Sequence, residues 1–596
     1  MSGDRPTTNY DPAALKEKYR EERDKRLRAD RDAQFQDATG VFEHFADDPF
    51  IKEPLQRAPV SEQVDVLVVG GGFGGLISAS KLVKAGVTDF RIVEQGGDFG
   101  GTWYWNRYPG IRCDIESYVY MPMLEEVGTI PSERYAKGAE IFGHCQAIGR
   151  HFDLYDRALF QTRVTRMDWS EEEARWIVGT DRGDRIEARH VMIGQGPLMK
   201  IKLPGIPGIQ DFEGRIFHSS RWDYDYTGGD TEGGQTRLAD KRVAVIGTGA
   251  TSIQIVPKLA EHAERVYIFQ RTPSTIAARN NGPTDVAWFK SQPKGWQKAR
   301  MENFLTIISG LPHKEDVVGD GWTDFWTRFA KRMAEQAASG ADRPPPEIMQ
   351  EVDFEKMEEL RAQVRELVKD PKTAEAAMPW YNYLCKRPLF SDNYLQSLNE
   401  ENITLVDTEG RGVTGISAHA VHVGDDRYEV DCIILATGFD VGARAHEAGG
   451  YEVTGRNGVT LSAYWSDGVK SLHGTQVHGF PNFHIVGGTA QGTLAFNYTH
   501  VLEIQGEHAV DQIACDLAEG IDVSEVSEEE QAEWYALLKA KKVDKQKFYE
   551  ECTPGFLNNE GNFRDKPTFV GSAYGGGPVE YTGIIAEWRQ ARKARR

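Results

Sequence analysis

The sequence predicts an α/β protein with two Rossmann-like domains, a helical insertion in the second domain and an N-terminal helical extension. Two glycine-rich turns carry this prediction. The first lies in VDVLVVGGGFGG and is followed by the strand FRIVEQ; the second lies in KRVAVIGTGATSIQ and is followed by RVYIFQR. Each turn follows a short apolar strand and opens a helix, which is the βαβ arrangement of dinucleotide-binding domains.

The order of these patterns divides the chain into six segments. Three helical stretches separate the second turn from the strands that return after about residue 400, and RPPPE at residues 343–347 interrupts them. We expect the chain then to rejoin the first domain. The expected segments are the N-terminal helical extension 1–62, first domain 63–205, second domain 206–275, helical insertion 276–378, second domain again 379–425, and first domain with a C-terminal lid region 426–596.

The N-terminal extension begins with a run of charged residues at helical spacing, DPAALKEKYREERDKRLRADRDAQF. Asp11 can cap this helix, with Pro12 at its first position. Because such charge runs are usually solvated, we expect an exposed helix on the surface of the main body.

Composition excludes several classes of function. The formal net charge of −20 argues against a nucleic-acid partner. No apolar run reaches the roughly 18 residues of a membrane span, and the start, MSGDRPTTNY, is polar. We therefore expect a cytoplasmic protein with no membrane span.

The six cysteines include no C-x-x-C pair. This spacing disfavours a zinc ribbon and a redox-active disulfide. In a reducing compartment free thiols are expected, and no metal site is predicted.

The first glycine turn matches G-x-G-x-x-G at Gly70, Gly72 and Gly75. Glycine allows the tight turn and the close approach of the backbone to a pyrophosphate at the helix N-terminus. Glu94 ends the next strand, where its carboxylate can accept hydrogen bonds from ribose hydroxyls. This pattern suits FAD or NAD.

The second turn has Gly247 and Gly249, with Ser252 in place of the third glycine. Arg271 stands close to the position that an acid occupies in the first unit. A carboxylate there would repel a 2′-phosphate, whereas arginine can bind it bidentately. The second site therefore suits NADPH; the alternative for Arg271 is a surface ion pair.

Residues 212–223, FEGRIFHSSRWD, lie between the two units and resemble the fingerprint of type I Baeyer–Villiger monooxygenases. The segments 100–117, 385–390 (CKRPLF) and 436–440 (ATGFD) are similar to that family as well. The extended N-terminus and the tail resemble the subgroup of cyclopentadecanone monooxygenase. The fingerprint matches are Phe212, Gly214, His218, Ser219, Trp222 and Asp223.

The resemblance implies an oxidoreductase with tightly bound FAD and with NADPH/NADP+. Its partners would be molecular oxygen and a ketone, bulky or cyclic, which is converted to an ester or lactone through a C4a-peroxyflavin. The alternatives are a flavin monooxygenase that acts on sulfur or nitrogen of its substrates, or a non-catalytic nucleotide-binding protein. The sequence indicates no oligomeric state.

Two residues match the family's catalytic pair. Arg387 would stabilise the anionic peroxide and adduct, since a guanidinium stays charged in a desolvated pocket. Asp114 would hold Arg387 in place. As alternatives, CKRP could be two surface cations before a turn, and DIES at residues 114–117 could cap a helix.

The same matches define two cofactor sites. The FAD site comprises Gly70, Gly72, Phe73, Gly75, Glu94, Gly101, Thr102, Trp103, Trp105, Asp114 and Tyr120. The NADP site comprises Arg112, Cys113, Gly247, Thr248, Gly249, Ala250, Thr251, Ser252, Gln254, Arg271, Thr272 and Lys386.

Two further expectations concern movement. His218 could be a general base, but its place between the units favours a hydrogen-bonding hinge. A mobile lid is expected after about residue 545, where TPGFLNNEGN departs from the better-known family members.

Overall fold

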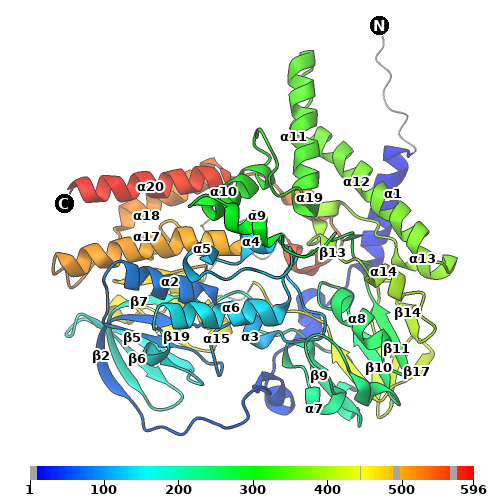
Figure 1. Ribbon diagram of the computed structural model, residues 1–596, viewed down its shortest axis with the longest axis horizontal. Coiled ribbons are helices and arrows are strands. Elements are labelled where there is room, and N and C mark those ends of the chain that lie inside the picture. Colours follow the sequence, from blue (N-terminus) through cyan, green and yellow to red (C-terminus); the bar gives the residue numbers. More distant parts are fainter. Residues whose placement is uncertain (1–9, 443–444, 488–496, 564–572, 596) are drawn as a thin grey trace.

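The computed structural model describes residues 10–442, 445–487, 497–563 and 573–595. Two sheets lie side by side, one for each glycine turn, and long helices cover them on one side (Figure 1). The α/β fold with two Rossmann-like domains is confirmed.

The first sheet has the strand order β19-β5-β6-β7-β2-β3-β4, and β20 also pairs with β7. β2 lies parallel between β3 and β7, and its residues Val66, Leu67 and Val68 are fully buried, as expected for a strand covered on both faces. The strands are β2 (Ser61–Val69), β3 (Phe90–Val93), β4 (Ala158–Leu159), β5 (Val164–Ser170), β6 (Arg175–Thr180), β7 (Arg185–Ile193), β19 (Glu452–Thr454) and β20 (Phe483–Ile485).

The second sheet is entirely parallel, in the order β14-β11-β10-β18-β9. Its strand β18 corrects the expected boundary at residue 426, because β18 lies between β10 and β9 and not in the first domain. The apolar run CIIL suits the centre of either sheet, and only strand pairing decides between them. The strands are β9 (Arg215–His218), β10 (Arg242–Ile246), β11 (Arg265–Gln270), β14 (Ile403–Asp407) and β18 (Cys432–Leu435).

Smaller sheets and short helices complete the two domains. The small strands are β12 (Ile276–Ala277), β13 (Leu389–Phe390), β15 (Gly415–Ser417), β16 (Ala420–Val423) and β17 (Asp426–Glu429). The helices are α2 (Phe73–Lys84), α3 (Thr102–Trp105), α4 (Ser117–Tyr120), α5 (Leu124–Val127), α6 (Gly138–His151), α7 (Tyr224–Thr227), α8 (Ser252–Ala260), α14 (Tyr394–Ser397), α15 (Ala445–Gly449), α16 (Leu461–Tyr464) and α17 (Tyr498–Ala518).

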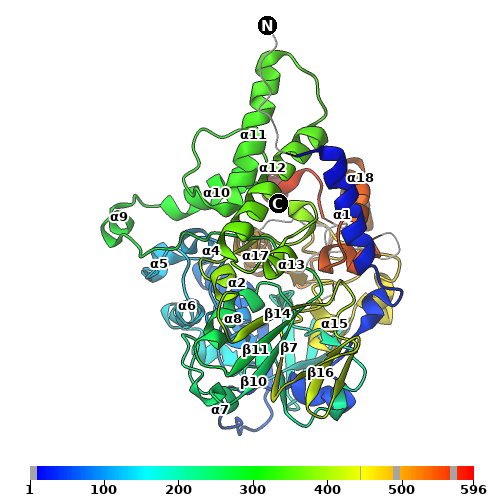
Figure 2. The same cartoon turned by 90° about the vertical axis from the view of Figure 1, so that its right-hand side faces the viewer.

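The helical insertion forms as expected and projects from the body in Figure 2. Asp320 caps α11 with a capping box, and the proline run separates α11 from α12. The helices are α9 (Val286–Ser291), α10 (Trp296–Ile308), α11 (Gly321–Ser339), α12 (Pro345–Leu367) and α13 (Pro371–Ala377).

The N-terminal extension is helical in α1 (Pro12–Arg26), which Asp11 caps, and in two 3-10 turns, η1 (Arg31–Gln34) and η2 (Gly40–Ala46). The strand β1 (Phe35–Gln36) pairs with β8 (Leu203–Pro204). As expected, α1 lies on the surface of the main body, but one of its faces is buried rather than exposed. Leu15 and Tyr19 pack on Phe354 of α12, because their spacing places them on the same side of α1.

The expectation of free thiols was wrong for two cysteines. Cys385 and Cys552 form a disulfide across a sequence separation of 167, with Cα atoms 5.2 Å apart. The fold brings them together, which no local spacing could indicate. Cys113, Cys145, Cys432 and Cys515 lie outside disulfides.

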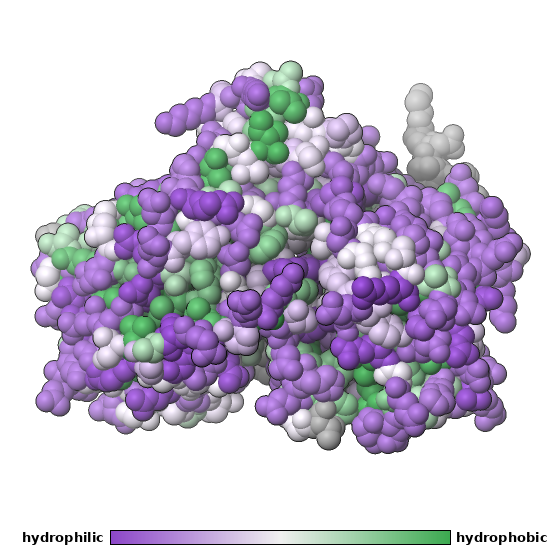
Figure 3. Space-filling view, turned by 60° about the horizontal axis from the view of Figure 1, so that its bottom comes forward, coloured by the Kyte–Doolittle hydropathy of each residue, from purple (hydrophilic) through white to green (hydrophobic). Residues whose placement is uncertain are grey.

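The C-terminal part returns to the first domain through α17 and ends in α18 (Glu528–Ala540), α19 (Gln546–Glu551), the 3-10 segment η9 (Phe556–Gly561) and α20 (Gly577–Arg595). Hydrophilic side chains cover most of the face in Figure 3, with hydrophobic ones scattered among them. Within the described residues no helix is long and apolar enough to cross a membrane.

Four buried histidines in the first domain predict acid-sensitive stability. Burial lowers the pKa of His473 and His484 from 6.5 to about 3, and lowers that of His190 and His508 as well. The unfolded chain therefore binds protons more readily, so stability is full above pH 6.5 and declines below it. As the pH falls from 6.5 to about 5.5, each of these histidines should lower the free energy of unfolding by about 1 kcal/mol.

Denaturant unfolding measured across this pH range checks the expectation. His508→Gln should reduce the loss of unfolding free energy at low pH by the contribution of one histidine. The same change at the exposed His151 should leave that loss unaltered. Equal slopes for the unchanged protein and His508→Gln would show that this histidine does not contribute.

Candidate active site

A cavity of about 2920 Å³ lies where the two domains and the insertion meet. Both glycine turns, the segment after the first turn, the CKRPLF segment and the C-terminal segment line it. The site is therefore assembled from parts of the chain that are far apart in sequence.

The first turn requires glycine at the predicted positions. A Cβ on Gly75 would lie 1.7 Å from the carbonyl oxygen of Gly70, and one on Gly101 would lie 2.7 Å from the Cα of Gly72. Gly70 also has φ of +104°, a conformation that favours glycine. Phe73 and Thr102 begin the two helices, α2 and α3, that open beside this bare backbone. The turn fits the pyrophosphate of FAD.

Glu94 follows β3 and lies buried beside the turn. Its carboxylate accepts hydrogen bonds from the backbone N–H groups of Gly71 and, at 2.6 Å, Gly96. Burial raises the pKa of Glu94, although these two N–H groups oppose the shift. A carboxylate has lone pairs for further donors, so Glu94 can still accept from a ribose.

Aromatic residues line the cavity next to the first turn. The indole Nε1 of the buried Trp103 donates to the Tyr120 hydroxyl at 3.1 Å. The guanidinium of Arg221 lies 4.0 Å from the ring centroid of Trp105. The rings of Trp103, Trp105 and Tyr120 are held by these contacts and line the part of the cavity expected to receive FAD.

The second turn has the same construction. Gly247 has φ of +112°, and a Cβ on it would lie 2.6 Å from the carbonyl oxygen of Ala436. The Thr248 hydroxyl donates to the Thr272 carbonyl oxygen at 2.7 Å. Gly249, Ala250 and Thr251 line the cavity, with open space beside Gly249.

Polar groups of the second turn are available to a bound nucleotide. Within the described part of the chain, the buried hydroxyls of Ser252 and Thr272 have no hydrogen-bond acceptor or donor within reach. Such atoms are rare in native proteins, and they fit a turn that receives a ligand. Ser252 opens α8, so the substitution of serine for the third glycine preserves the helix start.

The segment after the first turn meets the second turn through Gln254. Its Oε1 accepts from the backbone N–H of Arg112 at 2.6 Å, and Arg112 pairs with Glu133. Cys113 is buried, which raises the pKa of its thiol. Cys113 is therefore a neutral contact and not a thiolate.

Arg271 and Lys386 line the same end of the cavity. Arg271 is paired, but with a buried partner: its NH2 donates to Oε2 of Glu560 at 2.8 Å. Burial, followed by the nearby Arg271, lowers the pKa of Lys386 to about 7. The surface ion pair considered as an alternative for Arg271 is thus an internal one, with a residue that the sequence did not single out.

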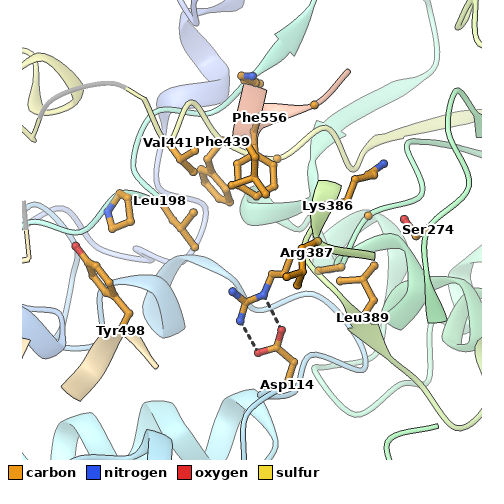
Figure 4. A pocket seen from close by; sticks show the side chains of 18 of the residues that line it. Asp114, Leu198, Ser274, Lys386, Arg387, Leu389, Phe439, Val441, Tyr498 and Phe556 are labelled. Atoms are coloured by element: carbon orange, nitrogen blue, oxygen red, sulfur yellow. Dashed lines mark hydrogen bonds and ion pairs between the residues drawn. The ribbon is translucent and has the colours of Figure 1, made fainter. Parts of the chain in front are cut away.

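Arg387 and Asp114 form a bidentate ion pair inside the cavity, with Nε and NH2 of Arg387 donating to the two carboxylate oxygens at 2.8 and 2.9 Å (Figure 4). Although burial opposes the charged form, Asp114 raises the pKa of Arg387. Lys386 points away from this pair (Figure 4). The helix-cap alternative for Asp114 is not seen, because α4 begins after Glu116 without a side-chain cap.

Trp322 of α11 contacts both members of this pair, and no local pattern in the sequence indicates that it does so. Its indole Nε1 donates to the backbone carbonyl oxygen of Asp114 at 2.7 Å, and the Arg387 guanidinium lies 4.8 Å from its ring centroid. The insertion thereby orients both charged residues.

The fingerprint residues lie outside the lining of this cavity, in β9 and in the segments just before and after it. Gly214 is needed for packing, since a Cβ there would lie 2.5 Å from the carbonyl oxygen of Asp431. Trp222 is buried and donates to the Thr227 hydroxyl at 3.0 Å, while Asp223 caps α7. Phe212 directly follows a 3-10 turn at Ile209–Asp211. Ser219 is buried at the start of another 3-10 turn, Ser219–Arg221.

His218 is fully buried in the fingerprint. Its Nδ1 lies 2.8 Å from the Ser220 hydroxyl and its Nε2 lies 3.2 Å from the Gly438 carbonyl oxygen. Burial, and then Arg221, lower its pKa to about 3. These contacts suit a neutral linker between β9 and the ATGF segment better than a general base.

The C-terminal segment lines the cavity through α19 and η9. Part of the lid expected after residue 545, residues 564–572, lies outside the described residues.

Comparison with known proteins identifies the family. Residues 63–291 match the model of the flavin-binding monooxygenase-like family. The chain is 47% identical to neopentalenolactone D synthase of Streptomyces avermitilis, over 98% of both chains. It is 44% identical to the Baeyer–Villiger monooxygenase ATR8 of Stachybotrys chlorohalonatus, over 98% of this chain and 94% of the relative.

Solved structures of ketone monooxygenases also match the chain. The polycyclic ketone monooxygenase of Thermothelomyces thermophila matches with a TM-score of 0.88 and 34% identity, covering 97% of each chain. A structure described as OTEMO in complex with FAD and NADP matches with a TM-score of 0.71 and 27% identity, over 90% of this chain and 99% of the other. Together with the two glycine turns and the paired Arg387, these similarities show that the chain belongs to the type I Baeyer–Villiger monooxygenases, which use FAD and NADPH to oxidise ketones.

Proposed function

We propose that this enzyme converts bulky cyclic ketones to lactones, with Arg387 as its catalytic cation and Asp114 as the residue that positions it. The overall reaction combines ketone, O2, NADPH and a proton to give lactone, water and NADP+. The observation that carries the proposal is the bidentate Asp114–Arg387 pair in a cavity lined by both nucleotide turns.

Once bound, NADPH would supply the hydride, and the reduced flavin would activate O2. Arg387 supplies a fixed positive charge, which stabilises the negative charge that develops on the ketone oxygen as the new bond forms. Asp114 and Trp322 hold the guanidinium in one orientation before substrate arrives, so little reorganisation is needed during the reaction.

The cofactor assignments follow the two turns. The first turn and Glu94 bind FAD, with Trp103, Trp105 and Tyr120 around its ring system. The second turn binds the pyrophosphate of NADPH, and Arg271 and Lys386 bind its 2′-phosphate. Support comes from Gly75 and Gly247, where the backbone leaves no room for a side chain, and from the two cations in the lining of the cavity.

An apolar wall beside Arg387 supports a bulky substrate. Phe439, Val441 and Phe556 gather on one side of the guanidinium, and Leu198 lies on another (Figure 4). The match to a polycyclic ketone monooxygenase supports the same substrate class. The closer placement in the cyclopentadecanone monooxygenase subgroup stays a prediction.

A panel of ketones tests the substrate class. Purified enzyme should oxidise large cyclic ketones, such as cyclopentadecanone and steroid ketones, with kcat/KM at least about tenfold above that for cyclohexanone, because more apolar surface is buried. Product identity and the ratio of product to NADPH consumed are measured together. A preference for cyclohexanone, or for a sulfide over every ketone, would contradict the proposal.

Replacement of the catalytic cation tests the mechanism. Arg387→Lys keeps a charge but loses the bidentate geometry, so kcat should fall by about 10²–10³ while the visible absorbance of bound FAD is retained. NADPH consumption should then yield hydrogen peroxide in place of lactone. Arg343→Lys is the matched control, because Arg343 lies just before α12 and forms an exposed ion pair with Glu351. A normal yield of lactone from Arg387→Lys would exclude the assigned role.

His218→Ala tests the linker role. The variant should retain FAD, since His218 does not line the cavity. Flavin reduction by NADPH should slow roughly tenfold, because the segment that leads from β18 back to the first domain loses its contact with β9 at Gly438. Anaerobic stopped-flow absorbance measures this step. Loss of FAD with a normal reduction rate in the remaining holoenzyme would refute the role.

A further inference from the structure

A buried carboxylate stands among the cations of the second nucleotide site. Glu560 is 5% exposed, accepts from Arg271 at 2.8 Å through Oε2, and places Oε1 3.6 Å from Nζ of Lys202. Burial alone would raise the pKa of Glu560, but Arg271, Lys202 and Lys386 outweigh it and hold the pKa below its ordinary value. Glu560 is therefore an anion beside the basic side chains of Arg271, Lys202 and Lys386.

The segment that carries Glu560 is built around it. The Asn558 side chain accepts from the N–H groups of Gly555 and Gly561 at 2.9 and 3.2 Å, and donates to the carbonyl oxygen of Tyr549. Asn559 and Glu560 have φ of +47° and +53°, two consecutive left-handed residues that are not glycine. Such strain persists only where the surroundings impose it, and it gathers at ligand sites.

The N-terminal extension braces the same segment. Arg31 donates to Oδ1 of Asn562 at 2.5 Å, and Arg23 donates to the carbonyl oxygen of Glu550 at 2.7 Å. Gln34 accepts from NH1 of Arg271 at 2.6 Å. Both terminal nitrogens of Arg271 are thus engaged, one by the extension and one by Glu560.

Two of the five N–H groups of Arg271 are engaged in this way, and its charge is already paired with Glu560. A phosphate that binds Arg271 bidentately therefore competes with Glu560, because two anions beside one guanidinium repel each other. A 2′-phosphate carries more charge than a carboxylate and offers three acceptor oxygens. The 2′-hydroxyl of NADH carries no charge and cannot displace Glu560 in the same way.

We propose that Glu560 is an internal substitute for the coenzyme 2′-phosphate, and that NADPH displaces it from Arg271 on binding. Glu560 then weakens the binding of a 2′-phosphorylated coenzyme, and its displacement makes the rearrangement of residues 556–562 a response to the 2′-phosphate. This inference rests on the proposed assignment of Arg271 and Lys386 to that phosphate. It also gives the N-terminal extension a function, since the extension holds the segment that the coenzyme displaces.

Calorimetric titration of the FAD-loaded enzyme with adenosine 2′,5′-bisphosphate and with 5′-AMP tests the exchange. Glu560→Gln should bind the bisphosphate at least about tenfold more tightly, because the competing charge is gone, while its affinity for 5′-AMP stays unchanged. Glu529→Gln, the same charge change at the exposed start of α18, should alter neither affinity. Unchanged or weaker binding of the bisphosphate by Glu560→Gln would overturn the inference.

Two additional variants separate this inference from the proposed site. Arg271→Ala and Lys386→Ala should each lose the preference for the bisphosphate over 5′-AMP; if they retain it, the phosphate site itself is misassigned. Should Glu560→Gln fold poorly, Glu560→Gly removes the carboxylate and suits the left-handed backbone. Hydrogen exchange at residues 556–562 should rise when the unchanged enzyme binds the bisphosphate, but not when it binds 5′-AMP; no rise would also overturn the inference.

Discussion

The ion pair between Asp114 and Arg387 is the interaction on which the site depends. It joins the segment after the first glycine turn to the segment that leaves the helical insertion, 273 residues later in the chain. A half-buried pair of this kind is costly to break, because removal of one partner leaves a charge without compensation. The pair therefore fixes how the first domain and the insertion meet, and the cavity follows from that contact.

The two nucleotide units were predictable because their signals are local. Gly70, Gly75 and Gly247 are required by backbone contacts within their own turns or with the adjacent strand, and a buried parallel strand has a continuous apolar sequence. The helices of the insertion were predictable for the same reason, from caps and proline positions. The pairing of Asp114 with Arg387 was not predictable from local pattern alone and was inferred from resemblance to the family.

The remaining features depend on contacts between distant segments. The sequence CIIL does not indicate that β18 joins the second sheet, and the charges of α1 conceal the face that meets Phe354. Nothing near Glu560 in the sequence indicates a neighbour at Arg271. In each case the local pattern is compatible with several partners, and only the assembled fold selects one.

The Cys385–Cys552 disulfide has a consequence for the interpretation of mutations. It joins the residue before Lys386 and Arg387 to the residue just before the TPGFLNNEGN segment, so a shift in either segment is transmitted to the other. Substitutions in η9 and in CKRPLF are then not independent, and their effects should not add, even though the two segments are widely separated in sequence. Variants that combine changes in both segments have to be assessed as double-mutant cycles rather than as sums of single effects.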